Sequence, residues 1–288
     1  MSYDNEKNAV RGGTLYLVAT PIGNLADLSE RAIKTLSEVD VIAAEDTRNS
    51  AKLLSILGIR KPLVSYHDHN RRERGDELAE RLLSGESVAL ITDAGTPGIS
   101  DPGEDMVALC AEKSIPVTLI PGACAGLCGL VLSGLPTGKF IFEGFLSAKS
   151  TERKARLTEL RDETRTVIYH EAPHKLKATL SDMVDILGGE RKIALCRELT
   201  KLNEEIIRTT LSDALAFYTE NEPRGEYVLV VGGAERQSGA AFWTELDERA
   251  HVAYYMESRG MSKNDAIKAA ARDRGVHKNE VYKKLAND

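Results

Sequence analysis

Between residues 14 and 126, short apolar runs alternate with segments of helical spacing. The runs fall at residues 14–19, 39–43, 63–66, 88–91 and 117–120, and the helical segments at 29–36, 50–57 and 73–83. The runs lack alternating polarity, which is typical of strands whose two faces are both covered by helices. Strands that are separated by helices pair in parallel, so this region predicts a parallel α/β domain.

The stretch from Asp93 to Gly103 reads Asp-Ala-Gly-Thr-Pro-Gly-Ile-Ser-Asp-Pro-Gly and follows the expected strand at 88–91. Its three glycines and two prolines fix a backbone that few side chains cover, so a ligand can approach the main chain closely. Open α/β sheets bind ligands in the crevice outside the carboxyl ends of their strands. We therefore expect this loop to form part of a binding site.

Three further polar loops follow expected strands, at residues 44–48, 66–72 and 121–125. Any one of them could be an ordinary connection, but together at one sheet edge they predict a cleft. The helix beginnings behind such loops suit anions and carboxylates, because the first amides of a helix are unpaired. The turn at 20–25 has a single glycine, so it lacks the Gly-x-Gly-x-x-Gly pattern, and hydride transfer with NAD is not expected.

A second α/β domain is expected after the glycine-rich stretch 122–134. Its candidate strands are residues 140–142, 166–169, 192–195, 205–207 and 227–231, with helices at 150–161 and 175–187. The strands that follow residue 195 have no helix between them, which indicates antiparallel pairing and therefore a mixed sheet. We expect a flexible tail at 1–12, domains at 13–122 and 123–236, a linker over 234–239, and a helical module at 237–288.

The helical module differs in charge from the rest of the chain. The whole protein has a net charge of -6, but residues 259–288 hold eight basic and four acidic residues. Ser262 precedes Asp265 by three residues, which resembles a capping box, and a turn at 275–279 separates two helices. This helix-turn-helix pattern with a basic excess predicts contact with nucleic acid. A helical pair that only packs on the body is the alternative.

Composition excludes several other classes. No apolar run approaches the roughly 18 residues of a membrane span, and the first residues lack the apolar core of a signal peptide, so we expect a cytoplasmic protein. The four cysteines are too scattered for a disulfide framework. Histidines at the spacing of metal ligands are missing as well, so no metal is expected.

Five motifs occur in an order that resembles one family. They are Thr20-Pro21-Ile22-Gly23-Asn24-Leu25, Glu45-Asp46-Thr47-Arg48, the 93–103 loop, Pro121-Gly122-Ala123 and Tyr169-His170-Glu171-Ala172-Pro173-His174. Together they resemble the ribosomal RNA small-subunit methyltransferase I family of the tetrapyrrole methylase superfamily, over about residues 13 to 288. The resemblance implies two α/β domains with S-adenosylmethionine in the cleft between them. It also implies a homodimer that methylates the 2′-hydroxyl of a cytidine ribose in the decoding region of 16S rRNA.

The resemblance also carries cofactor contacts onto this chain. The run from Gly95 to Ser100 matches the Gly-Asp-Pro cofactor loop of the superfamily, with Thr96 where many relatives have aspartate. The backbone of this run is therefore expected to make the contacts. The implied cofactor-binding residues are Pro21, Gly95, Thr96, Ile99, Ser100, Cys124, Ala125, Tyr169, Leu199 and Gly225.

Ionisable side chains on the loops at this edge are the catalytic candidates. A ribose hydroxyl is a weak acid, so a base or a cationic neighbour should help it to lose its proton. We expect Glu45, Asp46 or His67 to orient or deprotonate the hydroxyl, while Arg48 holds an adjacent phosphate. An ion pair between Asp46 and Arg48 that serves structure alone is the alternative. Asp101 is expected to brace its loop rather than to act as the base.

Two other functions remain open at this point. The first is a methyltransferase of the same fold that acts on a small molecule such as a corrinoid precursor, against which the basic helical module argues. The second is a non-catalytic RNA-binding or assembly factor, against which the complete set of loops argues.

Overall fold

The computed structural model describes residues 9–235, 243 and 246–286. The chain divides into two compact units, Met1–Ala234 and Glu235–Asp288. Most of the expected N-terminal tail and of the expected linker lies outside the described residues. Among the described residues, no helix is both long and apolar enough to cross a membrane.

The first unit begins with a parallel five-stranded sheet of order β3-β2-β4-β1-β5. Its strands are β1 (Leu15–Val18), β2 (Val41–Ala44), β3 (Leu63–Ser65), β4 (Val88–Ile91) and β5 (Val117–Ile120). Its helices are the short η2 (Leu25–Asp27), then α1 (Glu30–Glu38), α2 (Thr47–Ile56), α3 (Arg71–Leu83) and α4 (Gly103–Glu112). The predicted parallel α/β domain is confirmed.

Alternate residues of the central strands supply the two faces of this sheet. Leu15 and Leu17 of β1 pack in one cluster with residues of α3 and α4. Tyr16 and Val18 pack in another cluster with residues of α1 and α2. Because successive side chains of a strand point to opposite faces, a continuous apolar run fills both clusters at once.

The edge strand β5 departs from this pattern. Its first three residues are exposed, although its sequence is as apolar as that of the central strands. The expectation that every strand of this set is covered on both faces is therefore wrong for β5. The helix that follows it, α5 (Ala125–Ser133), packs against the second sheet instead.

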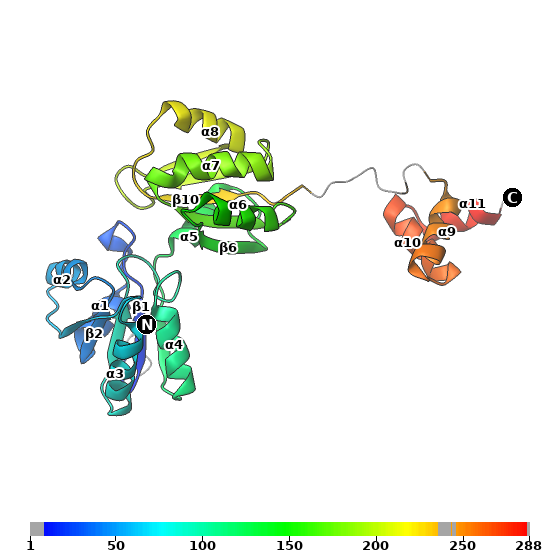
Figure 1. Ribbon diagram of the computed structural model, residues 1–288. Coiled ribbons are helices and arrows are strands. Elements are labelled where there is room, and N and C mark those ends of the chain that lie inside the picture. Colours follow the sequence, from blue (N-terminus) through cyan, green and yellow to red (C-terminus); the bar gives the residue numbers. More distant parts are fainter. Residues whose placement is uncertain (1–8, 236–242, 244–245, 287–288) are drawn as a thin grey trace. The chain divides into compact units, whose positions relative to one another are not determined.

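The second sheet has the order β6-β7-β10-β8-β9. Its strands are β6 (Phe140–Phe145), β7 (Thr166–Glu171), β8 (Lys192–Arg197), β9 (Glu205–Thr210) and β10 (Tyr227–Val231). Only β6 and β7 pair in parallel, so the predicted mixed sheet and its antiparallel β8–β9 pair are confirmed. The helices α6 (Ser150–Glu159), α7 (Pro173–Leu187) and α8 (Leu211–Glu220) cover one face, and α5 covers the other (Figure 1).

The second unit contains the helices α9 (Glu248–Arg259), α10 (Lys263–Arg274) and α11 (Lys278–Ala286). The Ser262 side chain accepts a hydrogen bond from the amide of Asp265, so the predicted cap of α10 is confirmed. Gly275 ends α10 with a φ of 65°, a left-handed conformation that favours glycine. Val252, Ile267 and Val281 join the three helices in one small core.

Candidate active site

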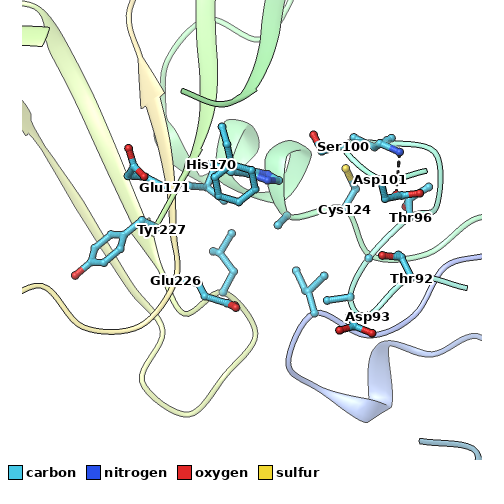
Figure 2. A pocket seen from close by; sticks show the side chains of 18 of the residues that line it. Thr92, Asp93, Thr96, Ser100, Asp101, Cys124, His170, Glu171, Glu226 and Tyr227 are labelled. Atoms are coloured by element: carbon cyan, nitrogen blue, oxygen red, sulfur yellow. Dashed lines mark hydrogen bonds between the residues drawn. The ribbon is translucent and has the colours of Figure 1, made fainter. Parts of the chain in front are cut away.

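A cavity of about 600 Å³ lies within the first unit, between the two sheets. One wall comes from the loops that follow β1, β2 and β4 and from the beginning of α5. The other wall comes from the ends of β6, β7 and β8 and from the beginning of β10. Figure 2 shows Thr96, Ser100 and Cys124 on one side of the cavity and His170, Glu171 and Tyr227 on the other.

The 93–103 loop is held by its own aspartate. The Asp101 carboxylate accepts hydrogen bonds from the amides of Gly98 at 2.9 Å, Ile99 at 3.2 Å and Gly103 at 2.8 Å. These bonds hold Ser100 in a left-handed conformation with a φ of 64°. The predicted role of Asp101 as a loop brace is therefore confirmed.

The same loop is tied to two neighbouring loops. The backbones of Thr20 and Gly95 exchange hydrogen bonds of 2.9 and 3.1 Å. The hydroxyl of Thr96 donates to the backbone oxygen of Ala123 at 2.9 Å. Thr96 therefore joins two loops of the cavity wall, and the main chain of Gly95 faces the cavity.

The structure brings most of the expected cofactor residues to one place. The expected residues that line the cavity are Gly95, Thr96, Ile99, Ser100, Cys124, Ala125 and Leu199. Pro21, Tyr169 and Gly225 do not line it, although the next residue in each case does. The Tyr169 ring lies in the core of the second domain, where burial raises the pKa of its hydroxyl. The cofactor contacts themselves stay predictions.

The four catalytic candidates are separated by the structure. Only Glu45 lines the cavity, at the end of β2, and its carboxylate accepts a hydrogen bond of 2.9 Å from the Thr92 hydroxyl. Asp46 caps α2 and binds Arg48 through both oxygens, at 3.1 and 2.7 Å. His67 lies outside the cavity lining, and its Nδ1 is buried.

The ion pair between Asp46 and Arg48 has a chemical consequence. Hydrogen bonds from the Arg48 side chain and amide lower the pKa of Asp46 to about 2. A carboxylate with so low a pKa is a weak base. Both oxygens of this one already accept hydrogen bonds from the Arg48 guanidinium. The structure therefore shows the ion pair between Asp46 and Arg48 that was the alternative to a catalytic role.

Acidic groups dominate the cavity wall. The lining carboxylates are Glu45, Asp93, Asp101, Glu171 and Glu226, whereas Lys201 is the one lining lysine or arginine among the described residues. Lys201 is itself paired with Glu198 at 2.9 Å and Glu226 at 2.8 Å. An acidic cavity of this kind suits a ligand that carries a positive charge.

Sequence reasoning missed several lining residues. Asp93 begins the loop, and it accepts hydrogen bonds from the Asp46 amide at 3.2 Å and the Asn49 side chain at 3.1 Å. His170 and Glu171 line the cavity and belong to the motif at residues 169–174, but they are not among the predicted site residues. Burial lowers the pKa of His170, which favours the neutral ring. Both residues lie at the end of the expected strand at 166–169, and this position in the sequence could have indicated that they face the cavity.

No metal site accompanies these groups. Among residues 9–235, 243 and 246–286, no cluster of three or more histidine, cysteine or acidic side chains could hold a metal ion.

Comparison with known proteins defines the class. Residues 14–215 match the family described as Tetrapyrrole (Corrin/Porphyrin) Methylases. The structure is similar to that of a uroporphyrin-III C-methyltransferase from Thermus thermophilus in complex with S-adenosylhomocysteine. The TM-score is 0.54 at 17% identity, over 76% of this chain and 97% of that chain. The chain thus has the fold of the tetrapyrrole methylases and belongs to that class.

Closer relatives narrow the class to one family. The chain is 48% identical to the ribosomal RNA small subunit methyltransferase I of Synechocystis over 94% of its length and 96% of the relative. It is 47% identical to the protein of the same name from Bacillus subtilis, over 94% and 93%. The chain therefore belongs to the ribosomal RNA small subunit methyltransferase I family.

Proposed function

We propose that this protein transfers the methyl group of S-adenosylmethionine to the 2′-hydroxyl of a cytidine in the decoding region of 16S rRNA. The observation that carries the proposal is an acidic cavity, walled by the glycine-rich 93–103 loop, in a chain that belongs to this family. A substrate in the small ribosomal subunit implies a cytoplasmic protein.

The cavity residues fit the cofactor. A volume of about 600 Å³ lies in the range of sites that enclose a small molecule. Gly95, Thr96, Ile99 and Ser100 of the 93–103 loop and the small side chains of Cys124 and Ala125 line the cavity and would hold it on the first-domain wall. The Asp93 carboxylate on the same wall suits its positive charge. When bound, the cofactor supplies an electrophilic methyl group on a sulfonium.

The residues of the chain supply position and a proton acceptor. Glu45 is half-buried, lines the cavity and receives a hydrogen bond from Thr92. We assign it the role of accepting the proton of the ribose hydroxyl. Asp46 already binds Arg48 and is therefore poorly suited to that role. The Arg48 side chain is 86% exposed, so its remaining N–H groups can meet an RNA phosphate while it holds Asp46.

Substitution tests the assignment of the base. Glu45→Gln keeps the size of the side chain and removes the proton acceptor, so the methylation rate should fall by about 10²- to 10⁴-fold while cofactor affinity is kept. Asp46→Ala and His67→Ala are the matched comparisons and should retain most activity. Normal methylation by Glu45→Gln would refute the role of Glu45.

The substrate is tested with three acceptors. Transfer of a radiolabelled methyl group is measured to 30S particles, naked 16S rRNA and a tetrapyrrole. We expect labelling of ribosomal RNA at a ribose hydroxyl and none of the tetrapyrrole. Labelling of the tetrapyrrole alone would instead support a small-molecule methyltransferase.

The helical module is proposed to contact rRNA, as a separate part of a chain with domains at 13–122, 123–236 and 237–288. Lys263, Lys278 and Lys283 are exposed on α10 and α11. Removal of residues 240–288 should weaken rRNA binding and make it less dependent on salt, because fewer phosphates are neutralised. Cofactor affinity should not change. Unaltered activity on the ribosomal subunit would contradict this role.

A homodimer is also proposed. Large apolar side chains are exposed on β5, at Val117 and Leu119, and on α5, at Leu127 and Val131. An open edge strand with apolar residues needs a partner or another form of protection. Sedimentation of Leu119→Glu and Val131→Glu tests this surface, and the proposal expects monomers. A wild-type protein that sediments as a monomer would refute it.

A further inference from the structure

The end of β6 contains a bulge that sets the direction of its last side chain. Phe142 pairs with Ile168 of β7. Phe145 pairs with His170, so three steps along β6 match two steps along β7. Because side chains alternate along a strand, one extra residue reverses the alternation beyond it. Phe145 therefore lies on the same face of the sheet as Phe142, whereas a regular strand would put it on the opposite face.

This reversal directs Phe145 to the cavity. The Phe145 side chain lines the cavity and is 58% exposed. Phe140 and Phe217 are also exposed but do not line the cavity, and Tyr227 lines it but is buried. Among the described residues, Phe145 is thus the one large aromatic side chain that is both exposed and part of the cavity wall.

Neighbouring groups hold the ring in place. The His170 ring meets it edge-on, with centroids 5.3 Å apart. The Lys175 ammonium lies 5.4 Å from the ring centroid, a distance that allows a cation–π contact. Lys175 is in turn fixed by the buried Glu171 at 3.1 Å. An aromatic ring that is held by a cation and still exposed offers a rigid surface to a planar ligand.

A nucleotide substrate requires such a surface. An enzyme that modifies a nucleotide inside a cavity must take it out of the base stack, which costs stacking and pairing free energy. Proteins that bind unstacked RNA bases offset this cost by stacking the bases on aromatic side chains.

We propose that Phe145 stacks on the pyrimidine base of the target nucleotide and so holds its ribose over the cavity. The inference rests on the proposed rRNA methylation and names the residue that receives the base. The adenine of the cofactor is the other planar group that could reach this ring, and the experiment separates the two.

The experiment compares Phe145→Ala, Phe145→Leu and Phe145→Trp with the wild type. Phe140→Ala is the matched control, because it removes the same exposed side chain from the same strand outside the cavity. Initial rates on 30S particles are measured at saturating S-adenosylmethionine, and S-adenosylhomocysteine affinity is measured by calorimetry. Melting temperatures identify any variant that fails to fold.

Phe145→Ala should lower kcat/KM for the subunit by about 10- to 100-fold, the scale of one base–aromatic stack, with cofactor affinity unchanged. Phe145→Trp should restore most of the rate and Phe145→Leu little of it, because leucine has no flat face. An equal loss of cofactor affinity in Phe145→Ala would assign the ring to the adenine and overturn the proposal. Full activity of Phe145→Leu or Phe145→Ala would also overturn it.

A wild type that transfers no methyl group to the subunit would refute the proposed function, and the inference would fall with it. A wild type that methylates the subunit while all three Phe145 variants match it would refute the inference alone.

Discussion

Replacement of Asp101 by alanine is the most direct test of how the cofactor loop is built. The Asp101 carboxylate accepts hydrogen bonds from three amides of its own loop, at 2.8 to 3.2 Å. Alanine removes all of these acceptors together. The loop then has no internal partner for three amides, and Ser100 loses the bonds that hold its left-handed backbone.

The magnitude follows from the number of bonds. A hydrogen bond to a charged group contributes about 1.5–3 kcal/mol, and water replaces part of that in a half-exposed loop. We expect a total cost of about 2–3 kcal/mol, mostly as local disorder of the loop rather than global unfolding. If cofactor binding must order the loop again, affinity falls by about 30- to 150-fold.

Calorimetric titration with S-adenosylhomocysteine measures the effect, and urea unfolding measures global stability. Glu104→Ala is the control, because it removes an equal charge from an exposed residue in the first turn of α4. Unchanged affinity in Asp101→Ala would refute the reasoning. An equal loss in Glu104→Ala would assign the effect to net charge rather than to the loop.

Three further predictions concern stability. Asp182→Ala should cost about 3–5 kcal/mol in urea unfolding, because it leaves Arg153 buried without its main partner, now 2.6 Å away. An unfolding midpoint equal to that of the wild type would contradict this. Gly129→Ala should cost about 1–3 kcal/mol, because a Cβ there would lie 2.7 Å from a methyl group of Val228. A melting temperature equal to that of the wild type would contradict this, because it would mean that α5 can move away from Val228 without cost. Burial lowers the pKa of His170 below its ordinary value of 6.5. As the pH falls below 6.5, the unfolded chain therefore binds more protons than the folded chain does, and the free energy of unfolding decreases. His170→Gln should reduce the loss of stability between neutral pH and about pH 5.5, and an identical loss in both proteins would refute the assignment.

The sequence predicted the sheets because continuous apolar runs and their order carry enough information. It did not predict the exposure of β5, whose apolar residues look like those of the central strands. Coverage of an edge strand depends on where the next helix packs, and α5 packs against the second sheet. The packing of α5 against the second sheet is a long-range contact, and the local pattern of apolar residues does not predict it.

The start of α2 shows a smaller error of the same kind. Apolar spacing placed the helix at residues 50–57, whereas the structure begins it at Thr47. The Asp46 side chain caps the first turn, which contains polar residues and therefore has no apolar period.

Site prediction was good for loops and poor for neighbouring side chains. Seven residues of the 93–103 loop line the cavity, namely Asp93, Ala94, Gly95, Thr96, Ile99, Ser100 and Asp101. Glu45 lines it while Asp46 does not, and His170 lines it while Tyr169 lies in the core. Successive side chains of a strand point to opposite faces, so Tyr169 packs in the core while His170 faces the cavity, although Glu171 beyond it lines the cavity too. A motif identifies the strand end without fixing which of its residues faces the ligand.

The carboxylates of the cavity can be ordered by how many of their acceptor positions are already filled. An ionised carboxylate has about four such positions. Asp101 receives three amides, and Glu171 receives the Ala172 amide, the Thr179 hydroxyl and the Lys175 ammonium.

Asp93 receives two donors, and Glu45 and Glu226 receive one each, counting the hydrogen bonds among the described residues. A filled carboxylate is a poor proton acceptor, because protonation would break bonds that it already makes. The one donor of Glu226 is the Lys201 ammonium, whereas that of Glu45 is a neutral hydroxyl, so Glu45 is the better placed of the two to take a proton. Asp93, on the neighbouring strand of the same wall, is better suited to hold positive charge, so Asp93→Asn should weaken cofactor binding more than Glu45→Gln does.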